Sequence, residues 1–118
     1  MPLVRVEMIA GKSSEYRKTV LNCIHDGLTE ALGIPDWDRF QRIVEIPSED
    51  FETAPGKSDA FMIIELTLFP GRTREQKGNA IHRITANLAD RLNIAPEDAF
   101  IIIHEPPNEN WGLSGQQR

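Results

Sequence analysis

The sequence of 118 residues predicts one domain, over residues 1–118, of the α/β (α+β) class. We expect two tandem β-α-β repeats that form a four-stranded mixed sheet with two helices on one face. Three observations lead to this prediction: short apolar runs flank stretches of helical periodicity, this pattern occurs twice, and its two copies are 60 residues apart. The repeats should span about 2–46 and about 61–104, followed by a C-terminal ribbon over 105–118.

The first repeat begins with an apolar strand over residues 3–9. A helix follows from Ser13, a good N-cap residue, to Gly33, a good terminating residue. Apolar residues within it recur at spacings of three and four, which predicts one buried stripe. They are Val20, Leu21, Ile24, Leu28, Ala31 and Leu32. Pro35 prevents the helix from continuing, and a second strand is expected over residues 39–46.

The second repeat follows a polar loop over residues 47–59 that is rich in Pro and Gly. We expect a strand over 61–69, a helix from Thr73 to Asn93 and a strand over 99–104. Eight residue pairs separated by 60 positions match without a gap: Gly11/Gly71, Ser13/Thr73, Glu15/Glu75, Leu28/Leu88, Leu32/Leu92, Ile34/Ile94, Asp38/Asp98 and Phe40/Phe100. Each repeat should pair its two strands in parallel through a right-handed crossover helix.

The apolar character of both faces of the expected sheet indicates an oligomer. The apolar runs over residues 61–69 and 101–103 are nearly continuous, which is typical of strands buried on both sides. The sequence offers no third helix to cover the second face. We therefore expect homo-oligomerisation, and we expect Trp111 in the ribbon to pack on a neighbouring subunit or a pocket.

Composition narrows the functional classes. Thirteen Lys and Arg against eighteen Asp and Glu give a net charge of −5, which argues against nucleic acid as a partner. The sequence contains no apolar run of the ~18 residues that a membrane helix needs, and no signal-peptide pattern, so we expect a soluble, cytoplasmic protein without a membrane partner. His25, His82 and His104 have no metal-ligand spacing, so no metal site is expected.

Pro2 directly follows the initiator methionine, at the start of an apolar strand. Removal of Met1 would leave the secondary amine of Pro2 as the chain's α-amino group. Such a group titrates near pH ~8, and an apolar, cation-lined pocket lowers that pKa, so the amine could act as a neutral base. The simpler interpretation is that Pro begins an edge strand because it needs no hydrogen-bond donor there.

Arg72, Arg74 and Lys77 lie at the start of the second helix. The helix dipole opposes cations there, so the cluster is either solvated charge balanced by Glu75 or a clamp for a substrate carboxylate. Asp38, just before the second strand, is either a turn acid or a group that binds water or holds Pro2.

Three motifs together resemble the tautomerase superfamily. They are Met1-Pro2 on a strand, Gly71-Arg72-Thr73-x-Glu75-Gln76-Lys77 at the second helix, and Trp111-Gly112-Leu113-Ser114-Gly115 near the C-terminus. The segment Gly33-Ile34-Pro35, with Asp38-Arg39-Phe40-Gln41, is similar to the fused-repeat branch that includes malonate semialdehyde decarboxylase. The resemblance spans essentially the whole chain and implies a tautomerase/MIF-like fold assembled as a homotrimer.

The resemblance also implies roles for individual residues. Pro2 would be the general base or acid, Arg72 would bind the substrate carboxylate, and Asp38 would assist the proline. Substrate-binding roles would fall to Trp111 as an apolar wall, to Arg74, to Phe100 and to His25. The chain departs from the family at Phe69-Pro70, where decarboxylase and dehalogenase relatives have a second arginine, and at Phe100, where 4-oxalocrotonate tautomerases have one.

The sequence therefore predicts a tautomerase that needs no cofactor and acts on a small 2-oxo or enol carboxylic acid, with Pro2 as general base. One alternative is a malonate semialdehyde decarboxylase-like lyase, or a hydratase or dehalogenase, with promiscuous tautomerase activity. A second is a catalytically silent trimeric binding protein.

Overall fold

The computed structural model of the chain describes residues 2–118. Its main elements are β1 (Leu3–Ile9), α1 (Ser14–Leu32), β2 (Phe40–Ile46), β3 (Met62–Thr67), α2 (Arg74–Leu92) and β4 (Ala99–His104). The 3-10 turns are η1 (Ser48–Asp50), η2 (Pro96–Asp98) and η3 (Asn108–Asn110), and the chain ends in a small hairpin of β5 (Gly112–Leu113) and β6 (Gln116–Gln117). This order of elements confirms the two β-α-β units.

The two helices start and stop where the sequence predicts. Ser13 and Thr73 are the N-caps, and each side chain accepts a hydrogen bond from a first-turn amide. Gln76 completes a capping box by accepting from the amide of Thr73. Gly33 and Asn93 end the helices in the left-handed region, with φ of 67° and 55°. Local capping chemistry thus sets the bounds of both helices.

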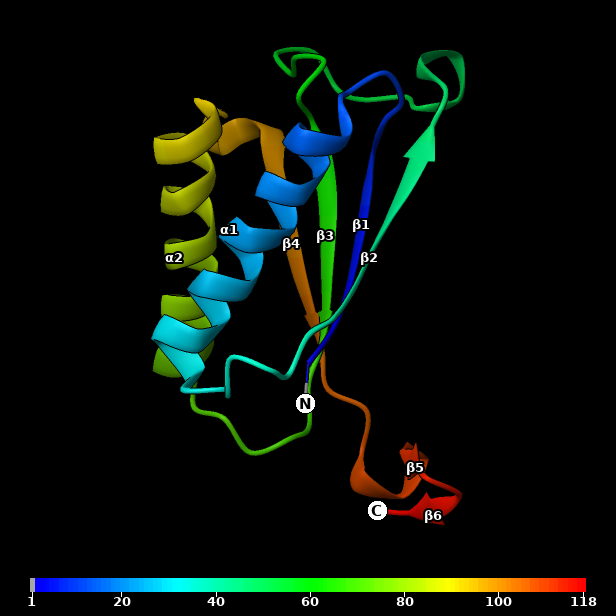
Figure 1. Cartoon of the computed structure of the whole chain (residues 1–118), viewed down its shortest axis with the longest axis vertical. Helices are drawn as coiled ribbons and strands as arrows, with labels where there is room; N and C mark the ends of the chain where they lie inside the picture. The colour runs from blue at the N-terminus through cyan, green and yellow to red at the C-terminus, as the bar shows by residue number, and fades with distance from the viewer. Residues whose placement is uncertain (1) are drawn as a thin grey trace.

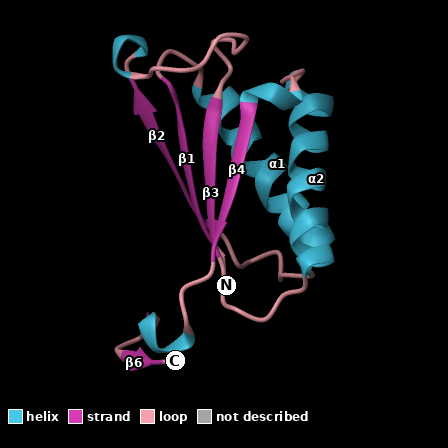
Figure 2. Cartoon of the chain, turned by 180° about the vertical axis from the view of Figure 1, so that it is seen from behind, coloured by secondary structure: helices cyan, strands magenta, loops and turns pink. Residues whose placement is uncertain are grey.

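The four strands form one mixed sheet in the order β2-β1-β3-β4 (Figures 1 and 2). β1 pairs in parallel with β2, β3 pairs in parallel with β4, and the central β1 and β3 are antiparallel. In the outermost paired row, Leu3 lies opposite both Phe40 and Thr67, and Thr67 lies opposite His104. The strand expected over 61–69 is shorter, because the Phe61 amide donates to the Ser58 carbonyl within the preceding loop.

Both helices cover the same face of the sheet (Figure 1). The inward residues of β1 and β3 are buried against them: Val4, Val6, Met8, Met62, Ile64 and Leu66. The helices approach each other closely at Gly27, where an added Cβ would lie 2.7 Å from Cγ1 of Ile84. This contact places the two helices as one layer on the sheet.

The other face of the sheet is covered by no described helix, and it is less apolar than the sequence suggests. Leu66 and Leu68 point to the helices, while Phe100 and Ile102 on the open face are 61% and 43% exposed. The same face holds Arg5, whose guanidinium lies 3.3 Å from a carboxylate oxygen of Glu7. Apolar and charged groups are therefore mixed on the face that we expect an oligomer to cover.

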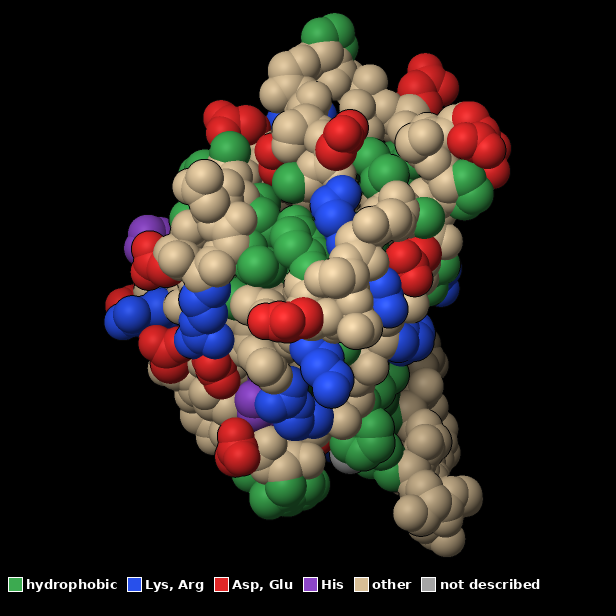
Figure 3. All heavy atoms as spheres, turned by 45° about the horizontal axis from the view of Figure 1, so that its top comes forward, with side chains coloured by type: hydrophobic (Ala, Val, Ile, Leu, Met, Phe, Trp, Pro, Cys, Tyr) green, Lys and Arg blue, Asp and Glu red, His purple; other side chains and the backbone are tan. Residues whose placement is uncertain are grey.

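The side of the molecule drawn in Figure 3 has mixed charge, with Lys and Arg side chains interspersed with Asp and Glu. None of the helices in the described part of the chain is long and apolar enough to cross a membrane.

Candidate active site

The start of β1, the α1–β2 connection, the β3–α2 connection and the C-terminal segment meet at one end of the sheet, which we call the proline end (Figure 1). The last paired row of the sheet at this end is Phe40, Leu3, Thr67 and His104. The strands stay aligned for one residue beyond it, because the Leu68 amide donates to the His104 carbonyl at 2.8 Å. Arg39, Pro2, Leu68 and Glu105 are then level across the four strands. Pro2 thus lies on a central strand, between the two connections that contain the other predicted catalytic residues.

Pro2 is buried and directly precedes β1. It continues the buried alternation of β1, in which Val4, Val6 and Met8 face the helices. The expected removal of Met1, which would free the Pro2 amine, concerns a residue outside the described range.

Asp38 is 6% exposed and lies in the turn before β2, next to Arg39, the residue level with Pro2. Its amide donates to the Pro35 carbonyl at 3.1 Å. The segment is fastened to α1 on both sides of Asp38, because Arg39 donates to the Asn22 side chain at 2.8 Å and His25 approaches the preceding Asp36. The fold therefore holds a buried carboxyl group at the proline end.

Arg72 lies in the 68–73 connection, directly before the N-cap Thr73. Gly71, at φ 124°, supplies the turn that brings this connection onto the helix. The Arg72 side chain is half-buried and makes no hydrogen bond or ion pair with the residues that the structure describes. A cation without a partner at the positive end of a helix is well suited to bind an anion.

The other two cations of the predicted cluster differ from Arg72. Lys77 is neutralised by Glu105, with Nζ 2.7 Å from Oε1. Arg74 is exposed and lines a hollow of about 430 Å³ along α2, together with Lys77, Gly78 and Ile81. Arg74 is thus near the proline end, beside the hollow that Lys77 also lines.

Trp111 is 8% exposed and is buried by its own chain. Its ring lies 4.6 Å from that of Phe69, centroid to centroid, and its indole N–H donates to the Pro106 carbonyl at 3.1 Å. The guanidinium of Arg118 lies 3.6 Å from the Phe69 centroid. The C-terminal segment therefore packs on the connection that contains Arg72, and the Arg118 guanidinium covers the Phe69 ring.

The structure does not bring Phe100 to the proline end of its own chain. Phe100 pairs with Ile63 at the opposite end of β3 and β4, which we call the far end, and it points to the open face. His25 is 1% exposed within α1, and its Nε2 lies 3.3 Å from Oδ1 of Asp36. Of the seven predicted residues, Pro2, Asp38, Arg72, Arg74 and Trp111 gather at the proline end.

Sequence reasoning missed Glu105, which follows β4 directly and reaches the first turn of α2. The available signal was an acid at the end of an apolar strand in a chain whose second helix begins with basic residues. Phe69 and Arg118 also contribute to this end, although their contact depends on the path of the C-terminal segment.

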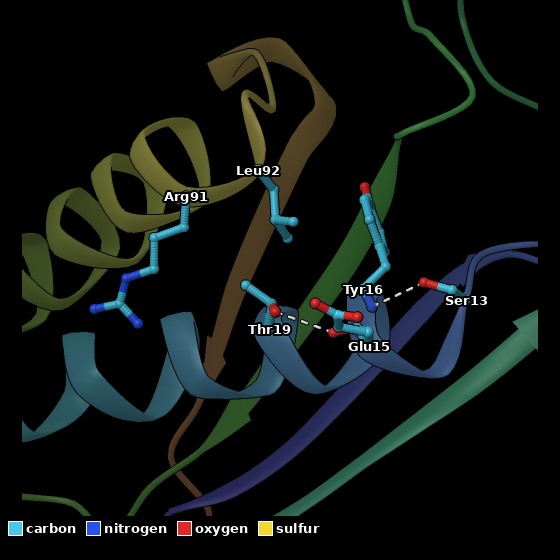
Figure 4. A pocket seen from close by; sticks show the side chains of 6 residues that line it. All are labelled: Ser13, Glu15, Tyr16, Thr19, Arg91 and Leu92. Atoms are coloured by element: carbon cyan, nitrogen blue, oxygen red, sulfur yellow. Dashed lines mark hydrogen bonds between the residues drawn. The ribbon is translucent and has the colours of Figure 1, made fainter.

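A second hollow, of about 300 Å³, lies between the start of α1 and the end of α2 near the far end (Figure 4). It is lined by Ser13, Glu15, Tyr16, Thr19, Arg91 and Leu92. Burial, and then the charge of Asp98, raise the pKa of Tyr16, so its phenol stays neutral at physiological pH. Three of the polar groups already have partners: Ser13 caps Tyr16, Thr19 bonds to the Glu15 carbonyl and Arg91 pairs with Asp26.

Neither a reactive cysteine nor a metal-binding cluster is found among the described residues. Burial raises the pKa of the Cys23 thiol, which disfavours a nucleophilic thiolate. Within residues 2–118, no three His, Cys, Asp or Glu side chains come together as a metal-binding group.

Comparison with known proteins gives one family for both repeats. Residues 38–114 match a family model described as tautomerase enzyme, and residues 2–56 match a second model with the same description. A protein of Bacillus subtilis (strain 168) named probable tautomerase YusQ is 28% identical over 118 residues, which covers 96% of this chain and 93% of that protein.

Two solved structures have the same fold over nearly the whole chain. FG41 malonate semialdehyde decarboxylase inhibited by 3-bromopropiolate is 32% identical, with a TM-score of 0.85 over 95% of this chain and 88% of that one. Native fused 4-OT is 21% identical, with a TM-score of 0.87 over 98% of this chain and 94% of that one.

Proposed function

Because the chain belongs to the tautomerase family of enzymes, we propose that it is a cofactor-independent tautomerase that acts on a small 2-oxo or enol carboxylic acid. The observation that supports this proposal most strongly is the meeting of Pro2, Asp38 and Arg72 at one end of the sheet. These residues come from three different segments of the chain, so only the fold brings them together.

In this proposal Pro2 is the general base. With Met1 removed, its secondary amine is the only α-amino group of the chain. Burial disfavours the charged ammonium form, so the amine is available to accept a proton from the enol oxygen and return one to carbon. The reaction is a proton transfer between oxygen and carbon, with no net gain or loss of atoms or electrons.

Arg72 binds the substrate carboxylate and stabilises the electron-rich enolate that forms between the two proton transfers. Its guanidinium is not used by another described side chain, and it lies beside the N-terminus of α2, where the helix dipole favours anions. A group placed at the position of developing charge lowers the barrier more than it strengthens substrate binding.

Trp111 acts through Phe69 in this proposal. The two packed rings form an apolar wall beside the Arg72 connection and keep water away from the amine. Arg74, at the start of α2, has a supporting electrostatic role, and His25 helps to hold the segment before Asp38.

The assembly is proposed to be a homotrimer. The exposed apolar side chains of the open face, Phe40, Phe100 and Ile102, would be covered by neighbouring subunits. Phe100, which is far from Pro2 in its own chain, would then be available to line the pocket of a neighbour.

A second function is favoured by one specific observation. Asp38 is buried at the same end as Pro2, and a carboxylate beside an amine stabilises the protonated form. Protonated Pro2 would polarise the carbonyl of a 3-oxo acid for decarboxylation, or assist addition of water to an unsaturated acid. The 32% identity to a malonate semialdehyde decarboxylase supports this alternative.

The first experiment compares the mature wild type with Pro2→Ala. Intact mass establishes that Met1 is absent, and ultraviolet absorbance follows the ketonisation of 2-hydroxymuconate. We expect the alanine variant to lose roughly 10²- to 10⁴-fold in rate, the range of a general base. Equal rates, or no rate above the solution reaction for either protein, would contradict the proposal and leave the binding-protein alternative.

Two further measurements separate the alternatives. 3-Bromopropiolate, with which a related decarboxylase was inhibited, should add mass to the N-terminal peptide of the wild type and not to that of Pro2→Ala. Asp38→Asn should keep the tautomerase rate within a few-fold if Pro2 acts as a base. Loss of decarboxylation of malonate semialdehyde with tautomerisation kept would instead favour the lyase.

A further inference from the structure

We propose that Lys77 and Glu105 are a positioning pair that fixes Arg72 relative to Pro2. This inference rests on the proposed function of Arg72 and adds two residues to which the catalytic proposal gives no role. The pair joins the first turn of α2 to the end of β4, with Nζ of Lys77 2.7 Å from Oε1 of Glu105. It directly links the helix that follows Arg72 to the sheet row that includes Pro2.

The sheet side of the link is rigid. Glu105 follows β4 and is level with Leu68 and Pro2 across the sheet, because the Leu68 amide donates to the carbonyl of His104. The Glu105 carboxylate is 24% exposed, and its second oxygen is shielded from solvent and makes no hydrogen bond with the residues that the structure describes. Lys77 is therefore its principal stabilising partner.

The helix side of the link is rigid as well. The capping box of Thr73 and Gln76 fixes the first turn, and the Lys77 amide donates to the Thr73 carbonyl at 3.1 Å. Arg72 directly precedes this turn. Displacing the start of α2 from the sheet would therefore move Arg72 together with it, while the pair at Lys77 prevents that displacement.

The pair also explains why a lysine stands where the helix dipole opposes it. Glu105 balances the charge of Lys77, so within the Arg72, Arg74 and Lys77 cluster Arg72 is the half-buried cation whose charge is not balanced by a described side chain. A pair that only stabilised the fold could lie anywhere on the helix. This one lies one turn from the residue that we propose to bind the substrate.

A matched control exists within the same helix. Arg91 of α2 pairs with Asp26 of α1, also at 2.7 Å between Nη1 and Oδ2, and its side chains are 40% and 41% exposed. Asp26→Asn breaks that pair, which joins the last turn of α2 to α1 and not to the sheet. The effect of losing the Arg91–Asp26 pair can thus be compared with the effect of losing the Lys77–Glu105 pair.

The experiment measures KM and kcat for 2-hydroxymuconate in wild type, Lys77→Met, Glu105→Gln, the exchanged pair Lys77→Glu with Glu105→Lys, and Asp26→Asn. Misplacement of a positioned group by about 1 Å costs on the order of 10²-fold, so we expect kcat/KM to fall by about 10- to 100-fold in the two single variants. The exchanged pair should recover most of that loss, and Asp26→Asn should stay within about twofold of wild type.

Two outcomes would overturn the proposal: equal losses in Glu105→Gln and Asp26→Asn, or a Lys77→Met effect that is fully additive with Arg72→Ala. If Lys77 acts through Arg72, its replacement has little further effect once the arginine is absent. Hydrogen exchange of the amides of residues 71–73 gives a readout without activity. Faster exchange in Glu105→Gln than in Asp26→Asn supports the pair even if the wild type is not a tautomerase, and equal exchange overturns it.

Discussion

The two ends of the sheet are built from matching positions of the two repeats, yet they differ in how their polar groups are used. At the far end, the position equivalent to Arg72 is Lys12, and the position equivalent to Asp38 is Asp98. Both far-end groups are engaged. Lys12 donates to the Asp59 carbonyl at 3.0 Å, and Asp98 accepts from both the amide and the hydroxyl of Ser58.

The proline end differs in its cation and in the residue before its strand. Arg72 has no ion-pair partner among the described residues, and Pro2 directly precedes β1, whereas the equivalent position is Met62, the first residue of β3. One fold thus presents the same constellation twice. At the far end, the cation and the acid are bonded to residues of the 47–60 loop. At the proline end, the cation remains available to a ligand.

The segments that follow β2 and β4 extend the comparison, because the repeat continues into them. Pro47, η1 and Phe51 match Pro107, η3 and Trp111 at the same separation of 60 residues. Their aromatic side chains have different partners. Phe51 packs edge-on against Phe61 at 5.7 Å, at the start of β3, whereas Trp111 packs on Phe69, in the connection after β3. Because its partner is Phe69, Trp111 lies beside the Arg72 connection, which Phe51 does not.

The largest difference is expected between Arg72→Ala and Lys12→Ala. Loss of a preorganised charged donor typically costs about 10²- to 10³-fold in rate, so Arg72→Ala should lower kcat/KM by that factor. Lys12→Ala, at the equivalent far-end position, should change it by less than about twofold. Steady-state kinetics on 2-hydroxymuconate decide the matter, and comparable losses in both variants would remove the distinction between the ends.

The two buried acids should separate stability from activity. Asp98→Ala removes two hydrogen bonds to a charged group and leaves the Ser58 amide unsatisfied, so we expect a loss of about 2–3 kcal/mol in the free energy of unfolding. Asp38→Ala, at the proline end, should lower any decarboxylation of malonate semialdehyde, the reaction that uses protonated Pro2, while Asp98→Ala should leave that reaction unchanged. Urea unfolding beside rate measurements on both variants tests this, and an Asp98 variant as stable as wild type would show that Ser58 is not its anchor.

Truncation of the matching aromatics should have a smaller effect. Trp111→Ala removes the wall beside the Arg72 connection, so KM should rise by a few-fold, and the lost aromatic contact should lower the stability by about 1 kcal/mol. Phe51→Ala should lower the midpoint of urea unfolding without a change in KM. A KM effect of Phe51→Ala equal to that of Trp111→Ala would contradict the assignment of Trp111 to the site.

The smallest expected effect concerns Tyr16 at the far end. Burial and the charge of Asp98 raise its pKa, so the stability that the neutral phenol contributes is present below its ordinary value near 10 and is lost as pH rises above it. Tyr16→Phe has nothing to titrate there, and its urea midpoint should fall less than that of wild type between about pH 9 and about pH 11. Cys23 is unchanged in both proteins, so its own titration cancels. Parallel pH curves would contradict a raised pKa.

The sequence alone determined the elements of this protein. Ser13, Thr73, Gly33 and Asn93 fix both helices through local capping, which depends on neighbouring residues only. The repeat of 60 residues and the strand periodicity then predict the sheet, because each β-α-β unit has one favoured handedness. Local chemistry and topology are sufficient for this level of structure.

The tertiary structure decided how the charged and aromatic groups pair. The sequence grouped Arg72 with Lys77, yet the fold neutralises Lys77 with Glu105, which is 28 residues away. It also buries Trp111 on Phe69 in the same chain and keeps Phe100 at the far end. Contacts of this kind depend on which strand ends and connections become neighbours in space, and no local pattern in the sequence records that.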